Sequence, residues 1–268
     1  AKGKAILIAA DTILQKLLNA GIVPDFVCSI ERIQQVYDYF YKDKQIPPEV
    51  TLVAPPLVKS VIFEEFPGHI VMPFRWNVGE YIWLDSQVTR FGADAFVSMG
   101  LSCAHLAFGF AVHLGASPIV FVGQDLAYAE DGEKSHSSGT VYDQLQITNH
   151  EKKIAVEGYY GNTVYSRETW VEFKNWFENE ILRCGVTAIN CTEGGSRIRH
   201  TMQMPLRDMI AQYCVAPVDV GRVIRECPNY DPDEALIAER IREQREEIAS
   251  IVKQLEELSE TLKNIDPQ

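Results

Sequence analysis

The sequence lacks a long apolar run: nowhere in its 268 residues do about 18 consecutive apolar side chains occur, the length that a membrane-spanning helix needs. Cysteine is sparse, and the six residues form no CxxC pair and lie partly in apolar, strand-like stretches. Such cysteines are typical of buried free thiols in a reducing compartment. We therefore expect no disulfide, no membrane contact and a cytoplasmic location. The opening Lys2-Gly3-Lys4, followed by a short apolar run that Asp11 ends, does not have the form of a signal peptide.

Basic side chains are also few. Lysine and arginine number 25 against 37 aspartates and glutamates, which gives a net charge of −12. Broad nucleic-acid binding needs basic surface to replace counterions, so nucleic acid is not expected as a partner. A small anionic ligand remains compatible with this charge, because backbone amides or a locally basic site can hold it.

Two nucleotide-binding signatures are missing as well. The chain has neither a GxGxxG fingerprint nor a GxxxxGK[ST] loop, which argues against a conventional dinucleotide enzyme and a P-loop NTPase. No spacing of histidine, cysteine and carboxylate residues resembles a structural zinc site, and we predict no metal ligands from the pattern.

What the sequence does contain is an alternation of short apolar runs with helical spacing. Residues 5–10 are a continuous apolar run of strand length, residues 26–30 form a second, mostly apolar strand, and residues 12–20 between them have the spacing of a helix that Gly21 ends. Strands that are apolar on both faces require a mostly parallel sheet with helices on both sides, so the fold class is α/β. Further strands are predicted at residues 50–54, 69–72, 95–99, 118–122, 162–165 and 186–190.

Other segments are less regular. Pro55-Pro56 predicts the start of a helix that runs to about Glu65, and Trp76, Tyr81 and Trp83 indicate an aromatic loop or lid. The polar stretch 129–157 predicts a loop or insertion over one end of the sheet.

The end of the chain is charged and helical. Residues 233–264 carry isoleucines and leucines at mostly three-, four- or seven-residue spacing. This apolar seam is too narrow for a free-standing core, so we expect the helix to pack on its own domain, on another domain or on a second chain. We divide the chain into a domain at 1–215 and a C-terminal helical extension at 216–268, through which the protein could form an oligomer.

Polar residues follow five of the predicted strands. In an open α/β sheet, ligands bind outside the carboxyl ends of the strands, so these residues are the candidates for a common cleft. They are Asp11, Ser29, Glu31, Ser98, Gly100, Ser102, Gln124, Asp125, Asn190 and Glu193. In particular, we expect Ser29, Gly100, Ser102 and Asp125 to line one pocket.

Several of these residues have two interpretations. Ser102 follows a strand–glycine turn, so amides there could hold a phosphate, or Ser102 could simply cap the next helix. Asp125 could bind a metal, a ribose hydroxyl or a cationic ring, or could cap a turn. His105 could face the cleft or the core. His136 lies in a hydrophilic Ser/Gly-rich segment, where an imidazole suits general acid–base chemistry.

Four segments, taken in order, resemble the motility accessory factor family of bacterial flagellin-modifying proteins. They are Asp11-Thr12 with Gly21 to Ile30, Gly100 to Ala107, Gly115 to Tyr128 with Lys134-Ser135-His136, and Asn190 to Ile198. The third is long and the most specific. The resemblance covers residues 1 to about 210.

The resemblance implies a Rossmann-like domain related to sialyltransferases. It implies transfer of a nonulosonic acid, a nine-carbon acidic sugar, from a CMP-activated donor to serines or threonines of flagellin. In that reaction His136 would be the base for the acceptor hydroxyl, Asp125 would stabilise charge at the sugar centre, and the other strand-end residues would hold the donor. No cofactor beyond the CMP-sugar is then expected.

The same superfamily implies two alternatives. One is a pterin pyrophosphokinase, in which Asp11, Glu31 and Asp125 would hold Mg²⁺ on the phosphates of ATP. The other is a non-catalytic module that binds or assembles flagellin. Two departures from the family pattern bear on these readings. A first strand with a Gly-Pro-Ser segment, usual in the family, is absent ahead of residue 1, and Glu31 stands where aspartate is common.

Overall fold

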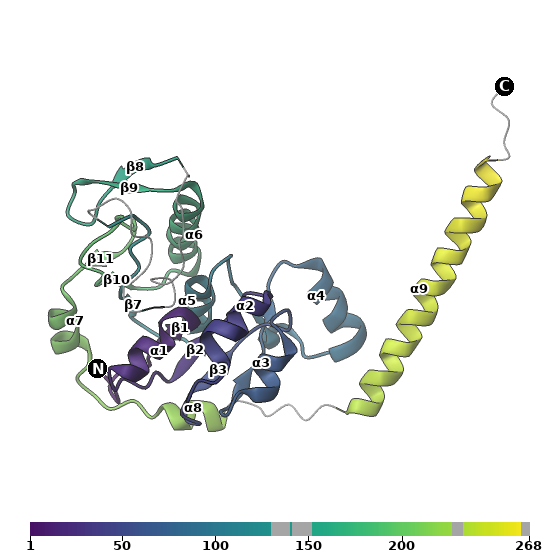
Figure 1. Cartoon of the computed structure of the whole chain (residues 1–268), viewed down its shortest axis with the longest axis horizontal. Coiled ribbons are helices and arrows are strands. Elements are labelled where there is room, and N and C mark those ends of the chain that lie inside the picture. The colour runs from purple at the N-terminus through teal and green to yellow at the C-terminus, as the bar shows by residue number, and fades with distance from the viewer. Residues whose placement is uncertain (130–139, 141–151, 227–232, 264–268) are drawn as a thin grey trace.

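Parallel β-sheets covered by helices form the centre of the computed structural model, which describes residues 1–129, 140, 152–226 and 233–263 (Figure 1). The strands are β1 (Ile8–Ala10), β2 (Phe26–Cys28), β3 (Thr51–Val53), β4 (Ile70–Val71), β5 (Phe74–Arg75), β6 (Phe96–Val97), β7 (Ile119–Phe121), β8 (Ile154–Glu157), β9 (Thr163–Ser166), β10 (Ala188–Asn190) and β11 (Met202–Gln203). The α-helices are α1 (Asp11–Asn19), α2 (Gln34–Val36), α3 (Ser60–Glu65), α4 (Gly79–Leu84), α5 (Cys103–His113), α6 (Glu168–Cys184), α7 (Leu206–Tyr213), α8 (Val220–Glu226) and α9 (Glu234–Lys263). Short π-helical turns η1 (Tyr37–Tyr41) and η2 (Asp85–Thr89) and a 3-10 turn η3 (Ala93–Ala95) complete the described elements.

The strands pair in parallel except for one hairpin. Four of them pair in the order β1-β2-β3-β4, and three in the order β11-β10-β7. β5 pairs with β6 in parallel, whereas β8 and β9 form the antiparallel hairpin. The Rossmann-like α/β fold class predicted from the sequence is confirmed.

Alternate residues along the strands serve two separate apolar cores, one on each face of the sheet. Val27 and Leu52 pack with Leu14 of α1 and Ile62 of α3. Their neighbours in the chain, such as Phe26, Cys28 and Val53, pack with Leu106 and Phe110 of α5. This two-sided burial is the reason that the strands are apolar throughout rather than alternating.

The three-stranded sheet β11-β10-β7 is covered in the same way. Phe121 of β7 packs with Phe108 of α5 and Phe177 of α6, with the rings of Phe108 and Phe121 stacked 5.6 Å apart. On the other face Ile189 of β10 packs with Met209 of α7. α5 therefore lies under both parts of the sheet, and Figure 1 shows it between α6 and β2.

Two sequence expectations differ in detail from the structure. The helix expected from Pro55 begins only at Ser60, because Pro56 restricts the residue before it to extended backbone and the segment first forms a turn closed by the Val58 amide on the Pro55 carbonyl. The expected aromatic loop contains a short strand and a helix, β5 and α4, with Tyr81 stacked on Phe74.

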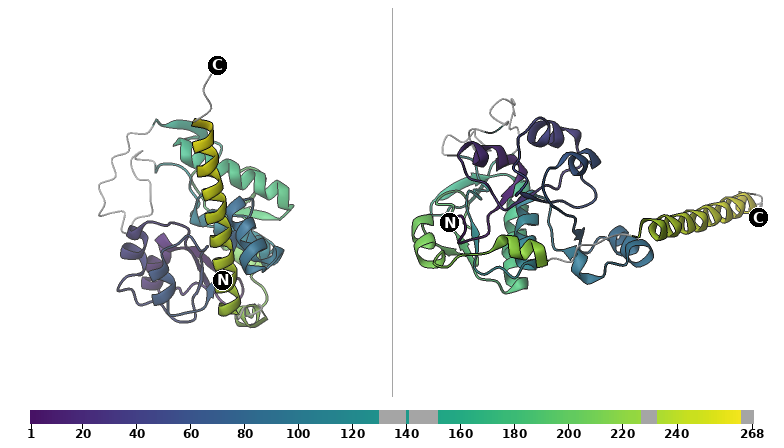
Figure 2. Two further views of the ribbon diagram at one scale, coloured as in Figure 1. Left: turned by 90° about the vertical axis from the view of Figure 1, so that its right-hand side faces the viewer. Right: turned by 90° about the horizontal axis from the view of Figure 1, so that it is seen from below.

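The helix α9 extends away from the sheet and its covering helices (Figures 1 and 2). It contacts them near its start, where Arg240 Nη1 donates to the Val88 carbonyl of η2 at 2.7 Å. Among the described residues, no helix has the length and apolar character that crossing a membrane requires. The five described cysteines are all free thiols, which confirms the expected absence of disulfides for that part of the chain.

Candidate functional site at the carboxyl ends of the strands

A buried carboxylate, Asp11, joins the ends of β1 and β2 to the start of α5. Ser29 Oγ donates to Asp11 Oδ2 at 2.7 Å, and the Thr12 amide donates to Oδ1 at 2.7 Å. Cys103 Sγ donates to the same Oδ1 at 3.5 Å. Both carboxylate oxygens are thus occupied, and three segments distant in sequence meet on one side chain.

Burial dominates the electrostatics of this group. It raises the pKa of Asp11 to about 6, although hydrogen bonds from Ser29, Thr12 and Cys103 act in the opposite direction, and the nearby charge of Glu31 adds a small increase. Burial and the proximity of Asp11 also raise the pKa of Cys103 and of Tyr41 well above their ordinary values. The Cys103 thiol therefore stays protonated at neutral pH and is a hydrogen-bond donor rather than a nucleophile.

The turn that precedes α5 is organised by His105. Ser102 Oγ accepts from the His105 amide at 3.2 Å, and the Leu101 amide donates to His105 Nδ1 at 3.0 Å. A Cβ atom on Gly100 would lie 2.3 Å from His105 Nδ1, so glycine is needed here for packing against the ring. Ser102 is thus a helix cap, and the Leu101 and His105 amides are already occupied within the chain.

His105 itself belongs to the core. It is 1% exposed, its ring lies 4.3 Å from that of Trp176, and its Nε2 is 3.1 Å from the Phe173 carbonyl. Burial lowers the pKa of His105 to about 4, and the charge of Arg75 adds to the lowering. Since Nδ1 accepts a hydrogen bond, Nε2 carries the proton and donates to Phe173. Of the two interpretations of His105, the structure supports the packing one.

A second group gathers at the ends of β7 and β10. The Gln124 amide donates to Thr192 Oγ1 at 3.1 Å, and the Thr192 amide donates to Asn190 Oδ1 at 3.0 Å. The Ser196 amide donates to the Asp125 carbonyl at 2.7 Å. These bonds fix the backbone of Asp125, whose exposed side chain accepts from no other described residue; partial desolvation raises its pKa.

Glu193 and Asn190 have mainly structural partners. Glu193 Oε1 accepts from the Leu206 amide at 2.8 Å, at the start of α7. The Asn190 carbonyl accepts from Tyr159 Oη at 3.1 Å. Asn190 Nδ2 is buried and has no hydrogen-bond partner among the described residues, so it is the buried side-chain atom of this group that is left unsatisfied there.

The structure thus gathers the predicted site residues into two groups, Asp11 with Ser29 and Asp125 with Gln124 and Asn190. No hydrogen bond within the described part of the chain joins them, and their convergence on a single cleft stays a prediction. Ser98 lines a separate cleft, described below. His136 lies outside the described residues.

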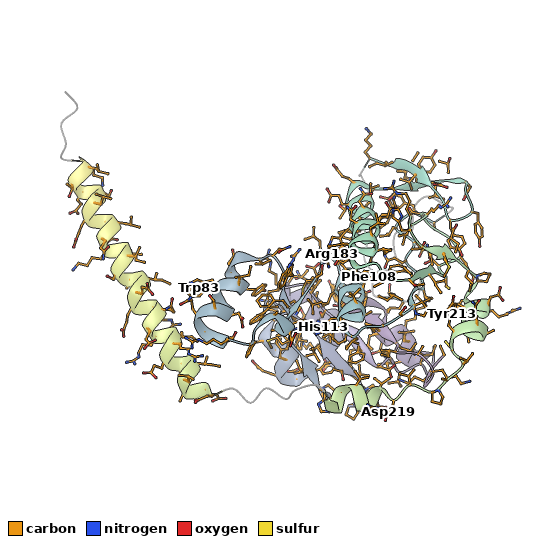
Figure 3. All side chains as sticks on the ribbon, turned by 180° about the vertical axis from the view of Figure 1, so that it is seen from behind. Trp83, Phe108, His113, Arg183, Tyr213 and Asp219 are labelled. Carbon is orange, nitrogen blue, oxygen red and sulfur yellow. The ribbon has the colours of Figure 1, made fainter. Side chains whose placement is uncertain are left out.

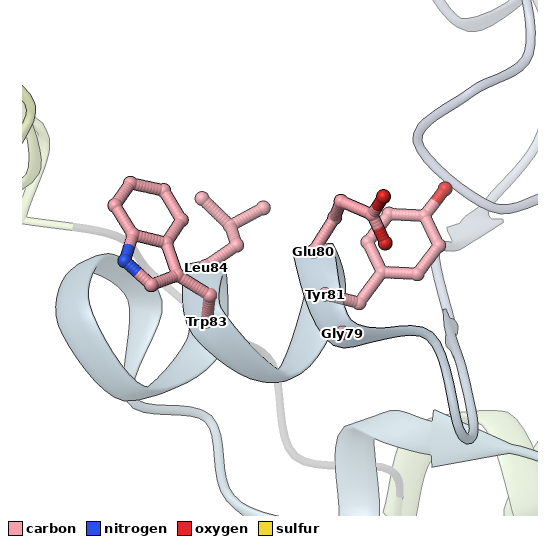
Figure 4. A pocket seen from close by; sticks show the side chains of 5 residues that line it. All are labelled: Gly79, Glu80, Tyr81, Trp83 and Leu84. Carbon is pink, nitrogen blue, oxygen red and sulfur yellow. The ribbon is translucent and has the colours of Figure 1, made fainter. Parts of the chain in front are cut away.

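Sequence reasoning missed several participants. The sequence gave no site prediction for Cys103, which begins an apolar helix, or for Tyr41, which ends the aromatic segment Tyr37–Tyr41. Only the fold brings these two residues to Asp11. A further hollow of about 510 Å³ runs along α4, lined by Gly79, Glu80, Tyr81, Trp83 and Leu84 (Figure 4). All five belong to one helix, so this hollow is not a candidate for the strand-end site.

Metal ligation requires several ligand side chains that surround one point. Across the described ranges, no three histidine, cysteine, aspartate or glutamate side chains are grouped so as to hold a metal ion. Asp11 has both oxygens engaged, and Asp125 belongs to the other group. The three carboxylates expected for Mg²⁺ under the pyrophosphokinase alternative are therefore not assembled here.

The fold is that of a Rossmann-like α/β protein, and polar side chains gather at the carboxyl ends of its parallel strands.

Known proteins with similar sequences or structures point to the same class. Residues 1–131 match the family model described as "6-hydroxymethylpterin diphosphokinase MptE-like". The structure of MAf glycosyltransferase from Magnetospirillum magneticum AMB-1 is similar over 75% of this chain, with a TM-score of 0.56 and 20% identity. The chain spans 29% of that protein's length, and no curated protein matches it. The predicted resemblance to the motility accessory factor family is confirmed at the level of the fold, which is what a structural likeness at this identity establishes.

Proposed function

We propose that this chain provides the donor-binding domain of a glycosyltransferase of the motility accessory factor type. It would bind a CMP-activated nonulosonic acid and take part in transferring the sugar to serine or threonine residues of flagellin. The observation that carries the proposal is the Asp11–Ser29–Cys103 group at the carboxyl ends of a parallel sheet, in a fold similar to that of a MAf glycosyltransferase.

Asp125 has the properties that the proposed reaction needs at the sugar centre. That centre gains positive charge as the phosphate leaves, and an exposed carboxylate on a fixed backbone can stabilise it. The Asp125 backbone is held by Ser196 and closely packed against Gly195, where a Cβ atom would lie 2.2 Å from the Asp125 carbonyl oxygen. Its carboxylate is left available for a ligand.

The binding test compares nucleotides. CMP and ATP with Mg²⁺ are titrated into the protein by calorimetry, and transfer is followed by mass spectrometry of flagellin incubated with a CMP-sugar. Binding of CMP together with a mass increase of flagellin supports the proposal. Binding of neither nucleotide contradicts it and leaves a flagellin-binding module.

The second candidate function is 6-hydroxymethylpterin diphosphokinase activity, favoured by the family match over residues 1–131. It requires ATP, and its proposed Mg²⁺ carboxylates are not grouped among the described residues. Preference for ATP over CMP, with diphosphate transfer to a hydroxymethylpterin, would establish it in place of glycosyl transfer.

His136 is the proposed general base. His136→Ala should lower transfer turnover by roughly 10²- to 10⁴-fold with donor affinity unchanged, the usual contribution of such a base. The matched control is His113→Ala, an exposed histidine at the end of α5, which should leave turnover unaltered. Turnover of His136→Ala near the wild-type value would reassign the base.

A further inference from the structure

A cleft of about 390 Å³ lies beyond the carboxyl ends of β5 and β6 and is closed on one side by α6. Its volume is within the range of small-ligand pockets, roughly 300–1,000 Å³. Arg75, Asn77 and Ser98 come from the two strand ends, and Glu180 and Arg183 come from α6. Figure 3 labels Arg183 on this helix. The position matches the rule that ligands bind past the carboxyl ends of parallel strands.

The charges in the cleft are not balanced. Arg183 donates to both oxygens of Glu180, from Nε at 2.8 Å and from Nη2 at 2.5 Å. Burial acts to raise the pKa of Glu180, but hydrogen bonds from Arg183 and Ser98 outweigh it and lower that pKa, so Glu180 is a stable anion. The charges of Arg183 and Glu180 therefore cancel, and the positive charge of Arg75 is the one that this pair does not compensate.

Arg75 is half-buried, and its guanidinium forms no hydrogen bond or ion pair with any described residue. Removing a charge from water without a partner costs free energy, so such a position favours an anion supplied from outside. An uncompensated arginine is notable in a chain whose net charge is −12.

Two tryptophans form the walls beside Arg75. Trp76 is 50% exposed and meets Phe96 edge-on at 5.7 Å, and Trp176 rests on His105 at 4.3 Å. Both rings are therefore held in place by packing while lining the cleft. Rigid aromatic walls beside a few polar groups are typical of pockets that orient small organic molecules.

We propose that this cleft binds the carboxylate or phosphate of a small organic anion on Arg75, with the adjoining planar or apolar part of the ligand against Trp76 and Trp176. Asn77 and Ser98 would supply hydrogen bonds to the same ligand. The inference rests on the proposed function, since a nonulosonic acid carries a carboxylate and CMP carries a phosphate. Both share the chemistry that Arg75 recognises.

The test measures binding of three probes, N-acetylneuraminic acid, CMP and inorganic phosphate, by calorimetry and by quenching of tryptophan fluorescence. Wild-type protein is compared with Arg75→Gln, Arg75→Lys and the control Arg207→Gln, an exposed arginine of α7 outside the cleft. Arg75→Gln should weaken the bound probe by about tenfold or more, the loss expected for a hydrogen-bonded charge. Arg75→Lys should recover part of that loss, and Arg207→Gln should bind as wild type.

The outcomes separate the inference from the proposed function. If the affinity for N-acetylneuraminic acid depends on Arg75, the cleft is the subsite for the sugar carboxylate. If the affinity for CMP depends on Arg75, the cleft is the subsite for the phosphate. If only inorganic phosphate depends on Arg75 and wild type binds neither CMP nor N-acetylneuraminic acid, the anion site stands and the glycosyltransferase proposal fails. If CMP binds equally to wild type and to a folded Arg75→Gln variant, and neither of the other two probes depends on Arg75, the proposed function survives and the anion site is overturned. Absence of binding of all three probes to wild type overturns it as well.

Discussion

Asp11 is a buried carboxylic acid with a raised pKa, so its titration should change the free energy of unfolding with pH. The folded protein holds the Asp11 proton up to about pH 6, whereas the ordinary value is 3.8. Protonation therefore favours the folded state; this contribution is complete below 3.8 and is lost as the pH rises through 6. At neutral pH the buried carboxylate costs roughly 3 kcal/mol.

Asp11→Asn should relieve that cost while keeping the size of the side chain. Between pH 4.5 and 7.5 the variant should gain roughly 2 kcal/mol in unfolding free energy relative to wild type. Urea denaturation at the two pH values measures it. Asp208→Asn on the exposed surface of α7 is the control and should show no such gain. An equal difference between Asp11→Asn and wild type at both pH values would show that Asp11 does not titrate in this range.

His105 should have the opposite pH dependence. Its folded pKa of about 4 lies below the ordinary 6.5, so the unfolded chain binds the proton more readily and stability falls as the pH drops from 6.5 toward 4. His105→Ala leaves the Leu101 amide without its partner, removes the side-chain hydrogen bond to the Phe173 carbonyl and opens a cavity, so it should cost roughly 3 kcal/mol at neutral pH. CMP affinity measured on the folded variant should stay within about twofold, and a selective loss of affinity would argue for a ligand role instead.

At the scale of elements, much of the sheet could be predicted because its strands are apolar on both faces and bounded by turn residues. The runs at 26–30, 118–122 and 186–190 correspond to β2, β7 and β10. The start of α3 was predicted too early, because a proline pair opens either a turn or a helix and the local sequence does not choose between them.

The candidate site was predictable only in part. Asp11 and Ser29 carry a signal, since both are polar residues directly after apolar runs, and the sheet does bring them into contact. The sequence did not indicate Arg75 as a site residue. Its candidacy depends on the lack of a hydrogen-bond or ion-pair partner among the described residues, and only the three-dimensional structure shows that lack. Gly100 suggested a turn that a phosphate could approach closely. In the structure, glycine is needed at this position because a Cβ atom would clash with the His105 ring.

α5 depends on another glycine whose replacement tests how closely the helix packs. A Cβ atom on Gly109 would lie 1.7 Å from the Ser98 carbonyl oxygen. Glycine-to-alanine changes inside helices ordinarily gain about 1 kcal/mol. Here the clash is with backbone, so we expect Gly109→Ala to destabilise the protein by about 2 kcal/mol or more in chemical denaturation. Gly79→Ala at the start of α4 meets nothing within 4 Å and should change stability by less than about 0.5 kcal/mol. A neutral or stabilising Gly109→Ala would mean that α5 lies farther from Ser98.

At the scale of the whole molecule, α9 is the helix whose apolar side chains are largely left exposed. Its apolar side chains recur at alternating three- and four-residue spacing, the heptad pattern of a coiled coil. The seam consists of Ile237, Ile241, Ile248, Ile251, Leu255, Leu258 and Leu262, with Gln244 at the one polar position. From Ile241 onward these apolar side chains are 36–59% exposed, which is costly for a helix that stands alone in water.

A second copy of the chain is the partner that this seam fits best, because a heptad repeat is complementary to itself. Thirty residues give a helix about 45 Å long, enough for four heptads. We therefore expect light scattering after gel filtration to give at least twice the mass of one chain. Ile251→Asp combined with Leu258→Asp should reduce it to 30.3 kDa without altering the thermal unfolding of the α/β domain, because these residues lie beyond the contact of Arg240 with Val88. Lys253→Glu, on the outer face of the same helix, should leave the mass unchanged. A single-chain mass for wild type at about 100 µM, or an unchanged mass for the double variant, would exclude self-association through α9; the seam would then have to pack against a different protein.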